Sequence, residues 1–179
     1  MRALNRLLIS VSLCCFVATA NAAPIDDATA AYIKGDYAQA FKLFRPLAAE
    51  GNSSSQNALG FMYVQGLGVT RNYQEAVKWH SLAAAEGNVI AQFNLGVMHH
   101  RGTGVSKDYE LAYFWWLLSS KSGDQDSINS LSYLEKKLML EQRENALAAA
   151  AKWSTVGKLH FLRSVDAGMK QDWSQNNVS

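Results

Sequence analysis

Apolar and polar residues alternate along the chain with the three- and four-residue steps of amphipathic helices. Residues 53–88 contain two such stripes, separated by a glycine-rich segment; the first comprises Leu59, Met62, Tyr63 and Gly66, and the second Tyr73, Ala76, Val77, Trp79 and Leu82. The stripes predict helices over about residues 54–65 and 73–86. Asn72 is a suitable N-cap for the second helix, and Gly87 is a suitable stop. We therefore expect a helix–turn–helix unit.

The same unit occurs twice. Residues 53–88 align without gaps with residues 89–124, and 12 of the 36 paired positions are identical. A period of this length is typical of stacked repeats, in which one unit is too small to bury its own apolar face. We assign a structural role to the most informative repeated residues: Gly60, Gly66, Gly68, Tyr73, Ala76 and Trp79 in the first copy, and Gly96, Gly102, Gly104, Tyr109, Ala112 and Trp115 in the second.

Small and large repeated residues suggest different structural tasks. The Gly-x-Gly-Val segment lets the chain turn tightly between the two helices. Gly60 and Gly96 fall in the middle of a predicted helix, where glycine costs about 0.5–1 kcal/mol relative to alanine, and they predict close approach of a neighbouring backbone. Trp79 and Trp115 are expected to fill the core between units.

Both ends of the repeat region are atypical. Residues 23–52 form a truncated repeat, in which Tyr37 and Gly51 precede Tyr73 and Gly87 by one period but the glycine turn is missing. Residues 125–154 are expected to form C-terminal capping helices, the second of them rich in alanine. We expect residues 155–179 to be a tail, partly helical or disordered. The pattern predicts an all-α fold of stacked helix–turn–helix repeats with atypical caps.

The first 22 residues have the features of a cleaved signal peptide. Arg2 and Arg6 precede an apolar run at residues 7–17, and Ala20-Asn21-Ala22 is a cleavage signal of the A-x-A type. The apolar run is too short to cross a bilayer, which takes about 20 residues. We therefore expect secretion across the inner membrane, a periplasmic location and no transmembrane segment in the mature chain.

Removal of this segment changes the candidate chemistry. Cys14 and Cys15 would leave with it, so the mature chain would have no disulfide, thiolate metal site or cysteine nucleophile. The 17 basic residues would lose Arg2 and Arg6, which leaves 15 against 15 acidic residues. Because the net charge is zero and no basic stripe is present, nucleic acid is not an expected partner.

The repeat resembles a known family. The resemblance is carried in the first copy by Ala58-Leu59-Gly60, Tyr63, Gly66-x-Gly68-Val69, Tyr73, Ala76, Trp79, Ala84-Ala85 and Gly87. The second copy keeps Leu95-Gly96, Gly102-x-Gly104-Val105, Asp108-Tyr109, Ala112, Trp115 and Gly123, and it departs at His99, Ser120 and Lys121. These residues are similar to the Sel-one-like repeat (SLR) family, relatives of the tetratricopeptide repeats. The resemblance covers about residues 26–153. It implies a right-handed α-solenoid that mediates protein–protein contacts, and it implies no shared catalytic activity.

The residues offer little for catalysis. Companion motifs for a Ser-x-x-Lys nucleophile are missing, and no carboxylate pair is placed for acid–base work. His99 and His100 are adjacent, so on a helix they point about 100° apart and are poorly placed to share a metal. We expect no enzyme activity, no metal site and no cofactor. The alternative is an envelope enzyme or binder that acts on peptidoglycan or β-lactam-like ligands.

Positions that differ between the copies predict the binding surface. The first helices of such stacks line the concave side, where scaffold positions stay alike and outward positions diverge. We expect a groove of exposed aromatic and polar residues that binds a protein or peptide, an envelope component in particular. An alternative for Phe61 and Phe93 is packing between adjacent first helices. The predicted partner-binding residues are Asn57, Phe61, Gln65, Phe93, Val97, His100, Arg101 and Tyr133.

Overall fold

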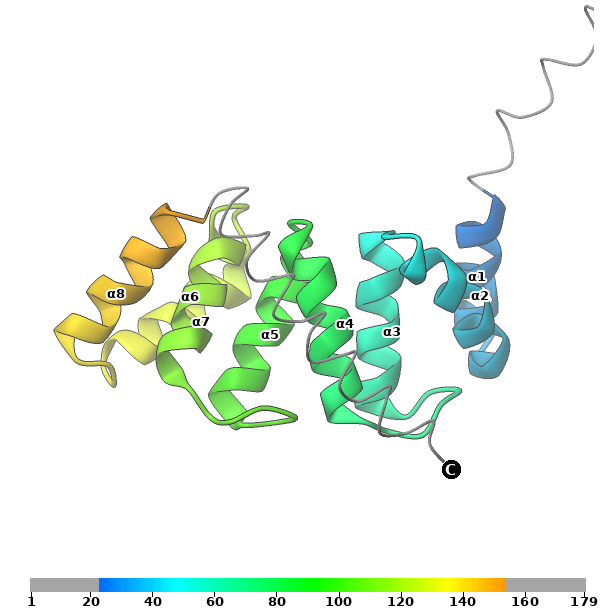
Figure 1. Ribbon diagram of the computed structural model, residues 1–179, viewed down its shortest axis with the longest axis horizontal. Helices are drawn as coiled ribbons and strands as arrows, with labels where there is room; N and C mark the ends of the chain where they lie inside the picture. Colours follow the sequence, from blue (N-terminus) through cyan, green and yellow to red (C-terminus); the bar gives the residue numbers. More distant parts are fainter. Residues whose placement is uncertain (1–22, 154–179) are drawn as a thin grey trace, which may run out of the picture.

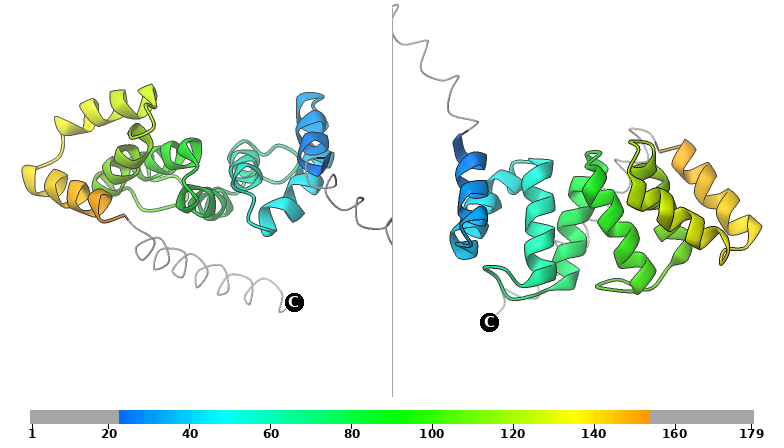
Figure 2. Two further views of the ribbon diagram at one scale, coloured as in Figure 1. Left: turned by 90° about the horizontal axis from the view of Figure 1, so that it is seen from above. Right: turned by 180° about the vertical axis from the view of Figure 1, so that it is seen from behind.

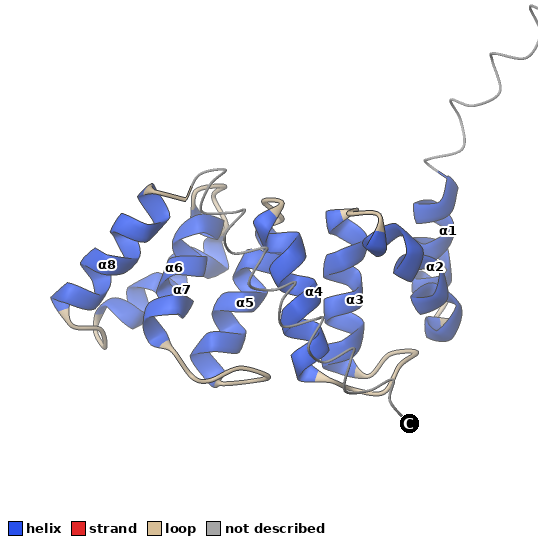
Figure 3. Ribbon diagram, in the orientation of Figure 1, coloured by secondary structure: helices blue, strands red, loops and turns tan. Residues whose placement is uncertain are grey.

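The computed structural model describes residues 23–153, and this range contains only helices and loops (Figures 1 and 3). The predicted signal peptide and the predicted tail lie outside the described residues. The helices are α1 (Ala23–Ile33), α2 (Tyr37–Ala49), α3 (Ser53–Gln65), α4 (Tyr73–Ala85), α5 (Val89–Arg101), α6 (Tyr109–Ser120), α7 (Gln125–Glu135) and α8 (Leu140–Ala151).

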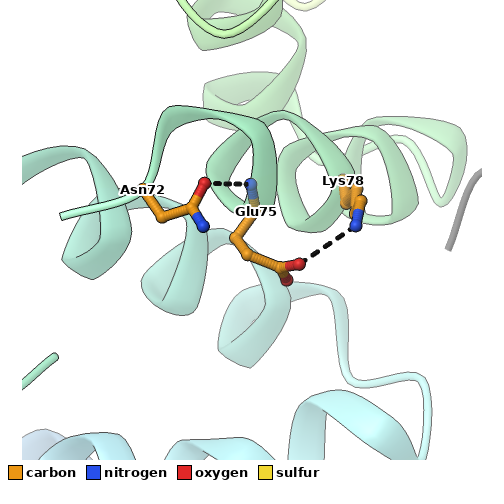
Figure 4. A network of polar contacts seen from close by, with 3 residues as sticks. All are labelled: Asn72, Glu75 and Lys78. Carbon is orange, nitrogen blue, oxygen red and sulfur yellow. Dashed lines mark hydrogen bonds and ion pairs between the residues drawn. The ribbon is translucent and has the colours of Figure 1, made fainter. Parts of the chain in front are cut away.

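Helices α2 to α7 begin in the same way. An Asn or Asp side chain at each N-cap accepts a hydrogen bond from the backbone N–H three residues later, which satisfies a donor that has no partner inside the helix. At α4 the N-cap is Asn72, which accepts from the N–H of Glu75 at 3.1 Å, and the Glu75 carboxylate lies 3.0 Å from Lys78 Nζ (Figure 4). The six caps are Asp36, Asn52, Asn72, Asn88, Asp108 and Asp124.

The helices pack in chain order, each against the next, from α1 through α7. The exception is α8, which packs on α6, so that α6 contacts both capping helices. Seen from above, α1, α3, α5 and α7 lie along one side of the row and α2, α4, α6 and α8 along the other (Figure 2). The two ends of the row bend toward the odd-numbered helices, which therefore line the concave face.

The apolar interior consists of two clusters. One is formed by α1, α2 and α3, with the half-buried Trp79 of α4 packed against it. The larger one is centred on α6, where Trp115 and Trp116 are only 2% and 3% exposed. The rings of Phe114, Trp115 and Trp153 meet edge to face, with centroids 5.0–5.6 Å apart. Helices α7 and α8 complete this cluster, through buried Leu134 of α7 and through Ala146 and Ala150 of α8.

The second glycine of each turn is held against the preceding unit. Gly66 and Gly102 are the left-handed C-caps of α3 and α5. Gly68 and Gly104 also have positive φ, and a Cβ on either would collide with the backbone carbonyl of Tyr37 or Tyr73, respectively. These tyrosines begin the second helix of the preceding unit. The turn therefore docks one unit on the previous one, and a side chain does not fit there.

The mid-helix glycines serve a different purpose from the predicted one. We expected Gly60 and Gly96 to face a neighbouring backbone, and this was wrong. A Cβ on Gly60 would lie 2.7 Å from the ring of His80, and a Cβ on Gly96 would collide with the ring of Trp116. Each glycine instead makes room for a flat side chain from the second helix of its own unit. Ala76 and Ala112, on those second helices, are fully buried.

A repeated glutamine also links successive units. The side-chain Nε2 of Gln56 donates to the carbonyl oxygen of Ala48 at 3.1 Å, and Gln92 donates to Ala84 at the same distance. Each bond joins the start of a first helix to the end of the helix before it, where backbone acceptors lack helical partners. The identity of positions 56 and 92 was the only sequence signal for this contact.

Candidate functional site

The eight predicted partner-binding residues all lie on odd-numbered helices of the concave layer. Four are solvent-exposed: Phe61 and Gln65 on α3, Arg101 at the end of α5, and Tyr133 on α7. The side chain of Phe61 is 40% exposed and that of Tyr133 is 50% exposed. These two residues occupy the same register position, two repeat lengths apart, with Val97 between them. Phe61 and Tyr133 are therefore the aromatic residues of the predicted surface that are most accessible to a partner.

Phe93 is not the exposed anchor that we expected. Its ring is half-buried and stacks on that of Trp116, with centroids 6.4 Å apart, and Trp116 Nε1 donates to the Phe93 carbonyl at 3.1 Å. Phe93 therefore packs within the fold, although its partner is α6 rather than the adjacent first helix. Val97 packs against the same apolar cluster. Asn57 is half-buried, and its Oδ1 lies 3.5 Å from Asn94 Nδ2.

The imidazole of His100 lies among aromatic rings from two helices. Its centroid is 5.4 Å from that of Tyr109, 5.7 Å from that of Trp116 and 5.8 Å from that of Tyr133. We call these four residues the His100 cluster. Of its members, His100 and Tyr133 were predicted to bind a partner and Tyr109 to support the scaffold. Trp116 was missed, although its change from His80 in the first copy was a usable signal.

Basic side chains surround the His100 cluster. Lys107 Nζ lies 4.8 Å from the centroid of the Tyr109 ring, and Lys137 Nζ lies 4.9 Å from that of Tyr133, both within cation–π range. Burial lowers the pKa of His100, and the nearby charges of Lys107, Arg101 and Lys137 lower it further. Cations from three separate segments therefore act on one imidazole.

The first repeat lacks such a cluster. Val64 stands where the second repeat has His100, and Asn57 stands where it has Phe93. The cation–tyrosine pair is kept, because the guanidinium of Arg71 lies 5.6 Å from the centroid of the Tyr73 ring. A basic–aromatic pair is therefore repeated at the start of α4 and α6, and only the second copy of it is enlarged into a cluster.

Residues 23–153 contain neither a candidate metal site nor a candidate membrane span. These residues include no group of three or more His, Cys, Asp or Glu side chains that could hold a metal ion, and His99 and His100 are each partly buried. No helix in the same range is both long and apolar enough to cross a membrane.

Comparison with known proteins identifies the repeat. A sequence model described as the Sel1 repeat matches residues 29–52, 53–88 and 89–124. A protective antigen present in uropathogenic Escherichia coli strains, which displays an SLR fold, superposes with a TM-score of 0.71 at 25% identity. A Sel1 repeat protein from Oxalobacter formigenes superposes with a TM-score of 0.61 at 26% identity. Among curated proteins, no sequence relative reaches significance.

The two structural relatives are longer than the aligned region. The alignments cover 80% and 77% of this chain, but only 32% of the antigen and 59% of the Oxalobacter protein. The chain therefore spans about a third of the first relative and about three fifths of the second.

Proposed function

This chain belongs to the Sel1 repeat family, whose members are generally protein-interaction scaffolds, and from that premise we propose that it is a non-catalytic periplasmic adaptor that binds another protein through its concave face. The partner is a component of the cell envelope. Binding needs no cofactor and no metal.

Two exposed aromatic side chains on the concave layer support this proposal. Phe61 and Tyr133 expose large rings on the concave layer, at the same register position of α3 and α7. Exposed aromatic side chains near an arginine are typical of interface hot spots, because they bury much area and lose little conformational entropy. A single partner segment that runs along the concave layer from α3 to α7 would contact both rings and cross α5, the helix that ends at Arg101. A helix or an extended peptide fits this description.

The proposed location rests on the first 22 residues. Their basic start, apolar run and A-x-A ending support export, and a chain without Cys14 and Cys15 is compatible with an oxidising compartment. Cell fractionation followed by intact-mass measurement tests this. We expect the protein in the periplasmic extract, shortened by the predicted leader. A full-length cytoplasmic protein would contradict the location and leave the binding surface to be judged separately.

The binding surface is tested by co-purification from envelope extracts, with Phe61→Ala/Tyr133→Ala compared with Leu111→Ala/Leu147→Ala. The control residues lie on even-numbered helices and are matched in exposure, at 42% and 49%. We expect the first variant to lose the proteins that co-purify with the wild type and the control to keep them. Circular dichroism establishes that both variants are folded. Equal recovery from the two folded variants would contradict the concave-face proposal.

A further inference from the structure

The surroundings of the His100 cluster indicate the chemistry of the partner, an inference that rests on the proposed function. We propose that the His100 cluster, with Arg101, Lys107 and Lys137, is the docking site for an acidic segment of the partner protein. Carboxylates of that segment pair with the three cations, and an apolar side chain of the segment packs on the exposed ring of Tyr133.

The three cations converge from different parts of the chain. Arg101 is the last residue of α5, Lys107 lies in the loop before α6, and Lys137 follows α7. Each is exposed, yet all three contribute to the electrostatic environment of the same half-buried imidazole. This convergence places positive charge beside the aromatic rings of the His100 cluster. There, the attraction between a carboxylate and the cations is screened less than in open water.

Two carboxylates lie near these cations in the sequence, and each is hydrogen-bonded to a neutral donor and keeps its negative charge. Asp108, next to Lys107, caps α6 by accepting from the N–H of Leu111 at 2.9 Å. Glu135, close to Lys137, accepts from the hydroxyl of Tyr113 at 3.2 Å. Within residues 23–153, the charges that act on His100 are all cationic. The three cations outnumber these two carboxylates, so the surroundings of the imidazole are positive and would attract an incoming anion.

A polar atom inside the cluster also lacks a partner. His100 Nε2 is buried and has no hydrogen-bond partner among the described residues. Buried polar atoms are nearly always hydrogen-bonded in folded proteins. Because this nitrogen is closed to solvent, it is an unpaired polar atom inside the fold and not a contact for a partner on the surface.

An acidic peptide suits this surface better than nucleic acid. Binding to a nucleic acid backbone relies on many phosphate contacts along a continuous basic path. This site has only three cations, and two of them, Lys107 and Lys137, lie over tyrosine rings. A short segment that combines carboxylates with an apolar residue matches both the charge and the rings.

Peptide selection on the full-length protein tests the inference. A phage library of random 12-residue peptides is selected against the wild type, and each enriched peptide is then measured against two variants. Lys107→Gln/Lys137→Gln removes two of the three cations of the site and leaves Arg101 in place. Lys34→Gln/Lys42→Gln removes the same charge from exposed positions after α1 and on α2.

We expect the enriched peptides to be rich in Asp and Glu and to include an apolar or aromatic residue. Their dissociation constants should rise about tenfold in the site variant and less than about twofold in the control. Replacing their Asp and Glu with Asn and Gln should also abolish binding. A set of enriched peptides without acidic bias, or equal weakening by both variants, would overturn the inference.

Two further results separate the possibilities. A single-stranded thymidine oligonucleotide that displaces the peptides at lower concentration than an acidic peptide does would assign the site to nucleic acid and overturn the inference. Loss of acidic-peptide selection, together with partners that still co-purify through Phe61 and Tyr133, would refute the acidic segment and leave the adaptor function standing.

Discussion

One position of the repeat holds a flat ring in every unit. Phe44, His80 and Trp116 are spaced by one repeat length, and all three are buried. In the two full units this ring lies over the mid-helix glycine, Gly60 or Gly96. His80 is the polar exception, because its Nδ1 is buried and has no hydrogen-bond partner among the described residues. Phe44 and Trp116, which occupy the equivalent position in the other units, show that this position accepts an apolar ring.

His80 should make the stability of the fold depend on pH. Burial lowers the pKa of His80 to about 4, whereas in the unfolded chain it returns to about 6.5. As the pH falls from 6.5 toward 4, the unfolded chain takes up the proton first, so stability present above pH 6.5 is lost. We expect a loss from this residue of about 2–3 kcal/mol between pH 7 and pH 4.5.

Urea unfolding at the two pH values, for the wild type and for His80→Phe, measures this contribution. The difference between the two proteins isolates His80, because His99 and His100 are common to both. The variant should lose less stability by the expected amount. An identical loss in both proteins would show that His80 is not buried in its neutral form.

The turn glycines offer a second test at the scale of the residue. Gly104 and Gly123 both have positive φ, at 75° and 81°, but only Gly104 faces the backbone of Tyr73. Gly123→Ala should cost about 1 kcal/mol for the left-handed conformation alone. Gly104→Ala should cost at least about twice as much, because the collision adds to the same strain. Chemical denaturation compares the two, and equal losses would exclude docking through this turn.

At the scale of the element, local signals located the helices well. The apolar stripes and the caps Asn72 and Asp108 predicted helices close to those found, because both signals act within a few residues. The docking of α8 on α6 was not predictable in this way. An alanine-rich helix has no strongly marked apolar face, and its partner is selected by the aromatic surface of α6 that the rest of the fold leaves open.

The docking of α8 can be tested with two substitutions on one helix. Ala146 is 2% exposed and belongs to the core around α6, whereas Ala149, one turn along, is exposed. Ala146→Asp should destabilise the protein by about 3 kcal/mol or more, because it buries an unpaired carboxylate. It should also shift the tryptophan fluorescence to the red as Trp153 leaves Phe114 and Trp115.

Ala149→Asp is the matched control and should change stability by less than about 0.5 kcal/mol. Urea unfolding followed by fluorescence and by circular dichroism measures both variants. Equal effects of the two substitutions would contradict the packing of α8 on α6.

At the scale of the whole molecule, the repeat pattern was sufficient to predict an all-α solenoid, since a unit that cannot bury its own faces must stack. The layer that carries the candidate surface also followed from the pattern. The exposure of individual residues on that layer could not be predicted from the repeat pattern. Phe93 is half-buried because Trp116, rather than a smaller residue, occupies the ring slot of the second unit. The grouping of Tyr133 with His100 depends on the angle at which α7 follows α6, and the sequence does not encode that angle locally.

In-cell photo-crosslinking tests whether the concave layer binds a protein. Benzoylphenylalanine is placed at position 61 or 133 on the concave layer, and at position 111 or 147 on the opposite layer, where exposure is closely matched. Positions 61 and 133 should yield covalent adducts with the same envelope protein, identified by mass spectrometry, whereas positions 111 and 147 should not. Adducts with that protein from positions 111 and 147 alone, or none from any position, would contradict the account.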